Sequence, residues 1–126
     1  MNKSFDLIAL IAYCTFIFWL SAQERLPVPP VFDFQDKLLH SGAYFVMGLL
    51  SWRALLHLSV SKWHLALLSS LFCSAYGLSD EWHQSFVPGR EPSIGDWLAD
   101  SLGAVMAVWM LSGVHYKRKA IASRQL

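Results

Sequence analysis

Charged residues are scarce in this chain. Asp, Glu, Lys and Arg make up 15% of its 126 residues, whereas a soluble domain carries about a quarter. Hydrophobic residues make up 55%, and the mean hydropathy is +0.38. Nothing in the charge pattern suggests a nucleic-acid-binding domain, because the only basic cluster is the short segment from Lys117 to Arg124. The composition predicts an integral membrane protein.

Cysteine is nearly absent too. Cys14 and Cys73 each lie in the middle of an apolar run, where a thiol behaves as a small hydrophobic side chain with little access to an oxidant. We expect both to be packing residues, with no disulfide and no redox role. The sequence also lacks internal repeats and low-complexity segments, so we predict one domain, residues 1–126.

Four apolar segments stand out, at about 5–22, 38–58, 63–79 and 94–114. Each is close to the roughly 20 residues that cross a hydrocarbon core of about 30 Å. Helices are expected, because backbone groups in lipid must satisfy their own hydrogen bonds. The predicted fold is therefore all-α, an integral membrane bundle of four transmembrane helices.

The first segment also has features of a cleaved signal peptide. Lys3 precedes its apolar core, and Ser21 and Ala22 lie near a possible cleavage point. However, Leu20 occupies the position where signal peptidase requires a small residue, and the apolar run is long for a signal core. We therefore expect an uncleaved helix.

The ten Lys and Arg residues predict the orientation of the bundle. Seven fall on one side of the membrane and three on the other: Lys3, Arg53, Lys62, Lys117, Arg118, Lys119 and Arg124 against Arg25, Lys37 and Arg90. Cytoplasmic loops are enriched in Lys and Arg, so both termini and the basic tail 115–126 are expected in the cytoplasm. We interpret Arg53 as a lone cation that extends to the lipid headgroups.

Tryptophans, prolines and small residues complete this prediction. We expect Trp19, Trp82 and Trp97 at the outer interface and Trp52, Trp63 and Trp109 at the inner one. Pro27, Pro29 and Pro30 predict an extended loop over 23–35, and Pro88-Gly89 predicts a turn. Two stripes of small residues, Ala66, Ser70, Ser74 and Gly77 in one and Gly103 and Ala107 in the other, predict close helix packing. His57, His64 and His115 are placed at the cytoplasmic boundary without a function.

Polar side chains recur at intervals of three or four residues at the predicted outer ends of three segments. They are Asp36, Lys37, His40 and Tyr44; Tyr76, Asp80, Glu81, His83 and Gln84; and Ser93, Asp96, Asp100 and Gly103. Such spacing places each set on one face of a helix. Asp100 lies roughly 9 Å along its helix from Ile94, so it needs a partner: Arg90, Lys37 or a histidine. Ionisable groups at membrane depth are costly and usually serve a function.

Helix capping offers a simpler explanation for some of these residues. Asp or Ser in a first turn accepts backbone hydrogen bonds and interacts favourably with the helix dipole, which would account for Asp36, Ser93 and Asp96. Capping does not explain why three segments carry ionisable groups at one depth. We therefore predict a polar cluster at the extracytoplasmic end.

The same residues carry a resemblance to a known family. The runs are Asp36-Lys37-x-x-His40-x-x-x-Tyr44, Asp80-Glu81-x-x-Gln84-x-x-Val87-Pro88-Gly89-Arg90 and Ser93-x-x-Asp96-x-x-x-Asp100-x-x-Gly103. In their order and spacing the chain resembles VanZ-like membrane proteins. Two positions depart from the pattern: Ser41 follows His40 where an aromatic residue is common, and Asp100 stands where other members carry Asn.

The resemblance implies a small multi-pass protein of the bacterial cytoplasmic (inner) membrane that acts in the cell envelope. The founding member is associated with resistance to the glycopeptide antibiotic teicoplanin, without an agreed biochemical mechanism. A link between this chain and teicoplanin susceptibility is therefore an expectation from the family, and the chemistry of the polar cluster has to come from its residues.

Our leading hypothesis is a pocket for an anionic headgroup at the outer leaflet, from a membrane lipid or a lipid-linked envelope precursor. Lys37 and Arg90 would hold phosphate, the latter with two parallel hydrogen bonds. The predicted ligand-binding residues are Lys37, His40, Tyr44, Asp80, Glu81, Gln84, Arg90, Asp96 and Asp100.

Three alternatives remain open at this point. A small intramembrane hydrolase or transferase would use His40 or His83 as base and Glu81 as acid. Conduction through the bundle would need polar groups in the inner halves, which look almost wholly apolar, so a blind pocket is favoured. A structural polar network in an accessory subunit would leave the function to an unknown protein partner.

The histidine spacing bears on metal binding. A metal held by His40, His83 and a carboxylate would lack the tight His-x-x-x-His spacing that helical metal sites often show. We therefore predict no metal and no cofactor.

Overall fold

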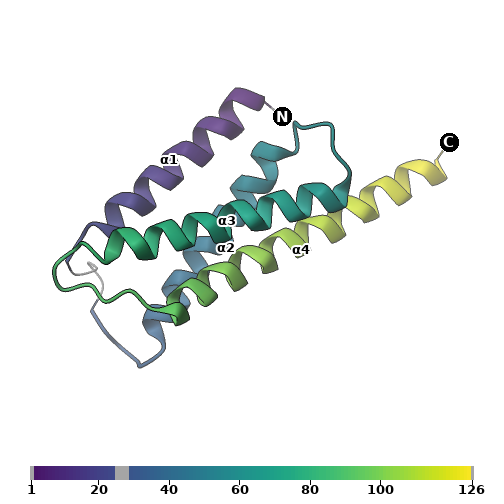
Figure 1. The fold of residues 1–126 in the computed structure, drawn as a ribbon. Helices are drawn as coiled ribbons and strands as arrows, with labels where there is room; N and C mark the ends of the chain where they lie inside the picture. The colour runs from purple at the N-terminus through teal and green to yellow at the C-terminus, as the bar shows by residue number, and fades with distance from the viewer. Residues whose placement is uncertain (1, 25–28, 126) are drawn as a thin grey trace.

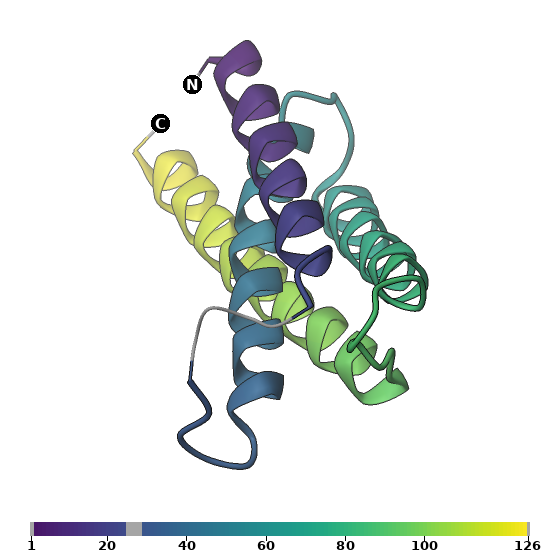
Figure 2. The same ribbon diagram turned by 90° about the vertical axis from the view of Figure 1, so that its left-hand side faces the viewer.

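The computed structural model describes residues 2–24 and 29–125, and these form four α-helices without a strand. The helices are α1 (Lys3–Ser21), α2 (Gln35–Leu55), α3 (Lys62–Gln84) and α4 (Ile94–Arg124). They alternate in direction, so the start of α1 and the end of α4 lie at the same end of the bundle (Figures 1 and 2). The all-α prediction with four helices is confirmed. Arg25 and Pro27, which we assigned to the first loop, lie outside the described residues.

Polar side chains begin three of the four helices. Asn2 accepts hydrogen bonds from the backbone N–H groups of Ser4 and Phe5 at the start of α1, and Ser61 and Ser93 begin α3 and α4 in the same way. The start of α2 has no side-chain cap. Ser93 therefore caps α4 as expected. Asp36 and Asp96 cap neither helix, but they lie in the first turns of α2 and α4, where a carboxylate interacts favourably with the helix dipole.

Two helices extend beyond the segments that hydropathy predicts. α3 continues from residue 79 to Gln84, because the polar side chains of this stretch find partners inside the bundle, as described below. α4 continues through the basic tail to Arg124, since Lys and Arg are good helix formers and interact favourably with the dipole at a helix C-terminus. At 1.5 Å per residue its 31 residues span about 46 Å, more than a hydrocarbon core of about 30 Å.

The loop after α3 turns sharply at Pro88-Gly89. Gly89 has a φ of +78°, and the N–H of Arg90 donates to the carbonyl of Val87 at 3.2 Å. Proline followed by a glycine with positive φ is the pattern of a type II turn. The predicted turn is confirmed, and it directs Arg90 back toward the bundle.

Helices α2 and α4 pack backbone to backbone. A Cβ atom on Gly103 would lie 2.0 Å from the carbonyl oxygen of Ser41, and one on Gly48 would lie 2.8 Å from that of Ala104. Ala104 and Ala107 are fully buried beside them. The predicted small-residue stripe of Gly103 and Ala107 is confirmed, with Gly48 as its unforeseen counterpart on α2. This close approach sets the polar start of α2 against the polar start of α4.

The bundle exposes many large apolar side chains, and its interior contains several carboxylates beside an apolar core. Large apolar side chains such as Trp63, Ile94 and Trp109 are 74–78% exposed. The buried carboxylates among the described residues are Asp6, Asp80, Glu81, Asp96 and Asp100. A protein surrounded by water normally shows the reverse. Among the described helices, α1 and α4 are long and apolar enough to cross a membrane, which indicates membrane association.

Two tryptophans do not fit the predicted interfacial belts. Trp52 is 3% exposed and packs in the core with Leu65 and Val108, so its assignment to the inner interface is wrong. Trp97 is half-buried, and its indole N–H donates to the carbonyl of Ser74 at 3.0 Å. The remaining four, Trp19, Trp63, Trp82 and Trp109, are exposed as an interfacial position requires.

A buried contact between Asp6, Arg53 and His57, which we had not predicted, lies where α1 begins and α2 ends. Asp6, which is 3% exposed, has its Oδ1 atom 3.1 Å from Nη2 of Arg53 and its Oδ2 atom 2.7 Å from Nε2 of His57. Arg53 is therefore not a lone lipid-facing cation, and His57 is not merely a boundary residue. The interior at this end is also less apolar than the sequence suggested.

Candidate functional site

The end of α1, the start of α2, the end of α3 and the start of α4 meet at the opposite end of the bundle (Figures 1 and 2). Polar side chains from all four helices, and from the loop after α3, point inward here. They form two adjacent groups that share His40. We call them the ion cluster (Asp36, Lys37, His40, Glu81, Asp96 and Asp100) and the pocket (Ser21, His40, Tyr44, Asp80, Gln84 and Arg90, with apolar walls).

The ion cluster joins α2 to α4. The ammonium group of Lys37 contacts Oδ1 of Asp96 directly and lies 3.9 Å from Oδ2 of Asp36. The Nδ1 atom of His40 lies 2.8 Å from Oδ1 of Asp100, and its Nε2 atom lies 3.9 Å from both Asp36 and Asp96. Asp100 is completely buried, so His40 supplies the partner that the sequence required for it.

Glu81 of α3 completes the ion cluster from the third side. Its Oε2 atom accepts the backbone N–H of Ser93 at 2.9 Å, which fixes the loop before α4 against the end of α3. Its Oε1 atom is buried and has no hydrogen-bond partner within the described part of the chain. Oδ2 of Asp100 is in the same situation, facing Gly77 of α3, where a Cβ atom would lie 3.2 Å away.

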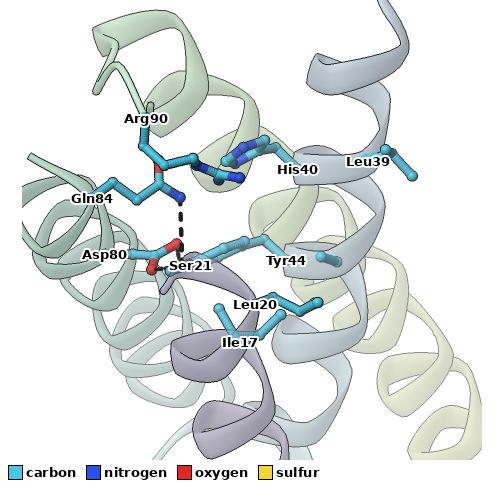
Figure 3. A pocket seen from close by; sticks show the side chains of 10 residues that line it. Ile17, Leu20, Ser21, Leu39, His40, Tyr44, Asp80, Gln84 and Arg90 are labelled. Carbon is cyan, nitrogen blue, oxygen red and sulfur yellow. Dashed lines mark hydrogen bonds between the residues drawn. The ribbon is translucent and has the colours of Figure 1, made fainter. Parts of the chain in front are cut away.

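The pocket lies beside the ion cluster and has a volume of about 80 Å³, enough for several water molecules. Its polar wall is held together by Asp80, which accepts hydrogen bonds from Ser21 and, at 3.4 Å, from the hydroxyl of Tyr44. The amide of Gln84 donates to Ser21 at 3.5 Å. Figure 3 shows these groups converging from α1, α2 and α3. The opposite wall is apolar, formed by Ile17, Leu20, Leu39 and Ala43.

Arg90 is the cation of the pocket. Its side chain comes from the loop after α3 and extends toward the ring of His40 (Figure 3). Lys37 is bound to Asp96, but Arg90 forms no salt bridge with any residue in 2–24 or 29–125. A guanidinium group offers five N–H donors in a planar fork that suits a phosphate or carboxylate. The pocket therefore contains a cation available to an anionic ligand.

The structure thus brings the nine predicted ligand-binding residues together at one end of the bundle, from Lys37 to Asp100, divided between the two groups. Two other candidates lie elsewhere. His83 stacks on Phe18 of α1 with ring centroids 4.2 Å apart and forms no hydrogen bond or ion pair with either group in the described chain. The hydroxyl of Tyr76 donates to the carbonyl of Cys14 at 2.5 Å, which makes it a link between α1 and α3.

Comparison with known families agrees with the motif that this site contains. Residues 5–115 match the model of the VanZ/LLP1 family. The chain belongs to the VanZ/LLP1 family. The match covers most of the chain and includes every residue of the ion cluster and the pocket, so the resemblance drawn from the motif is confirmed. Searches of curated proteins and of solved structures return no significant match.

In this VanZ/LLP1 chain, sequence reasoning missed the part that α1 plays in the site. Ser21 is 3% exposed, and its hydroxyl bridges Asp80 and Gln84. A serine at the end of an apolar run carries no signal by itself, because such a residue more often faces a headgroup or ends a helix. Asp6 did carry a signal, because it is an acidic residue inside a predicted span. It contacts Arg53 and His57 at the opposite end of the bundle.

Proposed function

We propose that this VanZ/LLP1 protein is a four-span protein of the bacterial cytoplasmic membrane, in which the pocket binds the phosphate of an anionic lipid at the outer leaflet. The lipid is a phospholipid or a lipid-linked envelope precursor. The observation that carries the proposal is the guanidinium of Arg90, which lies in the pocket without an ion pair among the described residues and faces an apolar wall.

Four spans are supported by the surfaces of α2 and α3. These helices contain 21 and 23 residues, which at 1.5 Å per residue span about 31 and 35 Å. Both expose large apolar side chains away from the bundle, including Leu38 and Val46 on α2 and Leu67, Leu71 and Leu78 on α3. Their charged residues gather at the helix ends or face inward, as a membrane span requires.

The orientation with both termini in the cytoplasm follows from the distribution of Lys and Arg. It places the pocket at the extracytoplasmic face. In a variant with Cys14 and Cys73 replaced by serine, Ser85→Cys should react with a membrane-impermeant thiol reagent in intact cells. The matched variant Ser123→Cys in the C-terminal turn of α4 should react only after permeabilisation. The opposite result would reverse the orientation.

The pocket fits one end of a lipid better than a whole headgroup. A volume of about 80 Å³ admits a phosphate group, while any sugar or peptide attached to it would stay outside. Arg90 would hold the phosphate with charge-assisted hydrogen bonds. The apolar side chains of Leu20, Leu39 and Ala43 would contact the first carbons of the lipid chain. Lys37 has a structural role in this arrangement, because Asp96 occupies its ammonium group.

Native mass spectrometry of the detergent-purified protein tests the proposal. The wild type should carry anionic lipid, and Arg90→Ala should lose it, because no second unpaired cation lines the pocket within the described residues. Arg124→Ala removes the same charge from an exposed position in the last turn of α4 and should leave lipid binding unchanged. Equal amounts of lipid on wild type and Arg90→Ala would overturn the proposal.

A link to teicoplanin susceptibility, which the family resemblance implied, follows if the bound lipid is an envelope precursor. Cells that express the wild type should then differ in susceptibility from cells that express Arg90→Ala at the same level. If Arg90→Ala loses the lipid but the cells are equally susceptible, this protein does not affect teicoplanin susceptibility. The lipid-binding proposal would still stand.

The pair of His40 and Asp100 favours a second candidate, a small hydrolase or transferase. A carboxylate 2.8 Å from Nδ1 orients an imidazole so that Nε2 can accept a proton. His40→Gln would then retain bound lipid but form no product when the purified protein is incubated with an envelope lipid extract. If wild type and His40→Gln give the same product profile by mass spectrometry, the enzymatic reading fails and the binding function stands alone.

A further inference from the structure

Negative charge exceeds positive charge in the candidate site. Five carboxylates, Asp36, Asp80, Glu81, Asp96 and Asp100, face two permanent cations, Lys37 and Arg90. Four of these carboxylates are at most 6% exposed, so water and salt screen them poorly. Taking ionised carboxylates out of water is costly unless charge partners compensate. The candidate site therefore has more carboxylates than permanently positive side chains.

The deficit is localised at two atoms. Oε1 of Glu81 and Oδ2 of Asp100 are both buried and have no hydrogen-bond partner within the described chain. Their residues are 6% and 0% exposed. Almost every buried polar atom in a folded protein has a partner. Two unpartnered carboxylate oxygens from facing helices mark a position where a ligand with positive charge is missing from the protein's own side chains.

The geometry around these carboxylates suits a metal ion. One potential ligand atom from each of His40, Glu81 and Asp100 lies within 4.8 Å of the others. Nδ1 of His40 and Oδ1 of Asp100 are 2.8 Å apart, a hydrogen-bond distance. Two adjacent ligands that are each about 2.1 Å from one metal are about 3 Å apart in octahedral and about 3.4 Å apart in tetrahedral coordination, so a small separation of this pair would admit an ion. Three helices thus supply ligands that chain spacing alone does not reveal.

We propose that His40, Glu81 and Asp100 form a binding site for a divalent transition-metal ion, Mn²⁺ or Zn²⁺. One imidazole nitrogen with carboxylate oxygens is a mixed donor set that both ions accept, since carboxylates suit Mn²⁺ and imidazole suits Zn²⁺. The ion would bind a ring nitrogen of His40 and one carboxylate oxygen each from Glu81 and Asp100, and it would reduce the excess negative charge.

A neighbouring group, Asp36, His40 and Asp96, meets the same distance criterion but is a weaker candidate. Lys37 already contacts Asp96 and lies 3.9 Å from Asp36, so an ammonium group compensates these two carboxylates. Asp36 is also exposed at the surface. We therefore assign the metal to the deeper group, with the pair of Lys37 and Asp96 beside it.

The proposed ion would lie next to the lipid pocket, because His40 belongs to both. It would add positive charge beside Arg90 and could bind an oxygen of the same phosphate. The metal site does not depend on the lipid proposal, since its ligands are all side chains of this protein. This differs from the site of His40 and His83 that we considered from the sequence and set aside.

Metal titration of the detergent-purified full-length protein tests the inference. After treatment with a chelator, wild type should bind one Mn²⁺ per chain by electron paramagnetic resonance, or one Zn²⁺ by elemental analysis after gel filtration. Glu81→Gln and Asp100→Asn preserve side-chain volume and should weaken metal binding at least about tenfold. Glu91→Gln removes the same charge from an exposed loop position and should bind as wild type does.

Wild-type protein alone gives a second readout that does not depend on the folding of any variant. A metal that binds only the folded state raises the unfolding temperature as its concentration increases, and a nitrogen coupling in the pulsed resonance spectrum of bound Mn²⁺ would identify His40. Absence of stoichiometric binding of either ion to wild type overturns the metal site, as does unchanged binding in both Glu81→Gln and Asp100→Asn. Arg90→Ala should lose lipid but keep metal, so failure of the lipid proposal is distinguishable.

Discussion

Both ends of the bundle bury carboxylates, but they differ in how many of the carboxylate oxygens have a partner. At the first, both oxygens of Asp6 are occupied, one by Arg53 and the other by His57. At the second, five carboxylates share two permanent cations, two carboxylate oxygens have no partner in the described chain, and a pocket opens beside them. A buried charge with all its partners is explained by structure. The incomplete set is the one that indicates a ligand.

Buried ionisable groups in apolar helices can be structural or functional, and the two ends of this bundle show the difference. Ionisable residues at membrane depth are taken as functional by default, and that rule would select both ends equally. The two ends differ in the number of carboxylate oxygens that have a partner: both oxygens of Asp6 do, but only one oxygen each of Glu81 and Asp100. We therefore treat the cluster of Asp6, Arg53 and His57 as a fastening between α1 and α2, and the cluster around His40 as the functional site.

The largest expected effect comes from breaking the close contact between α2 and α4 beside the candidate site. Gly103→Ala would place a Cβ atom 2.0 Å from the backbone carbonyl of Ser41, and a backbone atom cannot move aside as a flexible side chain can. We expect α2 and α4 to separate, with a loss of about 3 kcal/mol or more in the free energy of unfolding. Chemical or thermal unfolding in detergent measures this loss.

A second glycine of α4 provides the control. A Cβ atom on Gly113 meets nothing within 4 Å, so Gly113→Ala should be neutral or stabilising by up to about 1 kcal/mol. Equal effects of the two substitutions would show that the close approach at Gly103 is not what holds the start of α2 against the start of α4.

Matched substitutions of one buried aspartate at each end compare the two ends directly. Asp6→Asn removes a fully partnered charge and should lower the unfolding temperature while leaving lipid and metal binding intact. Asp100→Asn keeps an oxygen that can face His40 and replaces only the unpartnered oxygen, so the metal-free protein should change in stability by less than about 1 kcal/mol and lose metal binding. Thermal unfolding and metal titration of both variants check this. If Asp6→Asn abolished binding and Asp100→Asn only destabilised, the assignment of the two ends would be reversed.

The smallest expected effect tests the polar wall of the pocket. The hydroxyl of Tyr44 donates to Asp80 over 3.4 Å, a long hydrogen bond, so Tyr44→Phe should cost only about 0.5 kcal/mol. The hydroxyl of Tyr13 donates to the carbonyl of Ala43 at 2.7 Å, and Tyr13→Phe should cost about 1 kcal/mol or more. Unfolding in denaturant compares the pair. A larger loss for Tyr44→Phe would mean that the wall around Asp80 contributes more to stability than its geometry indicates.

The amino-acid sequence by itself determined the class of fold and most of the polar residues of the site, though not Ser21. Runs of about 20 apolar residues form helices because each backbone group can bond only within its own segment, and this local rule gave four helices near their observed positions. The intervals of three and four residues placed Lys37 with His40, and Asp96 with Asp100, on common helix faces for the same local reason. The helix ends were less accurate, because α3 and α4 continue through polar residues that hydropathy counts against a span.

The tertiary structure alone decided which of these residues are partners. His40 contacts Asp100 and Lys37 contacts Asp96 because Gly103 and Gly48 let α2 and α4 approach closely in one register. Asp6 meets Arg53, and Ser21 meets Asp80, across separations of 47 and 59 residues. Pairing over such distances depends on how the helices pack against each other, a property of the whole bundle that no single segment contains.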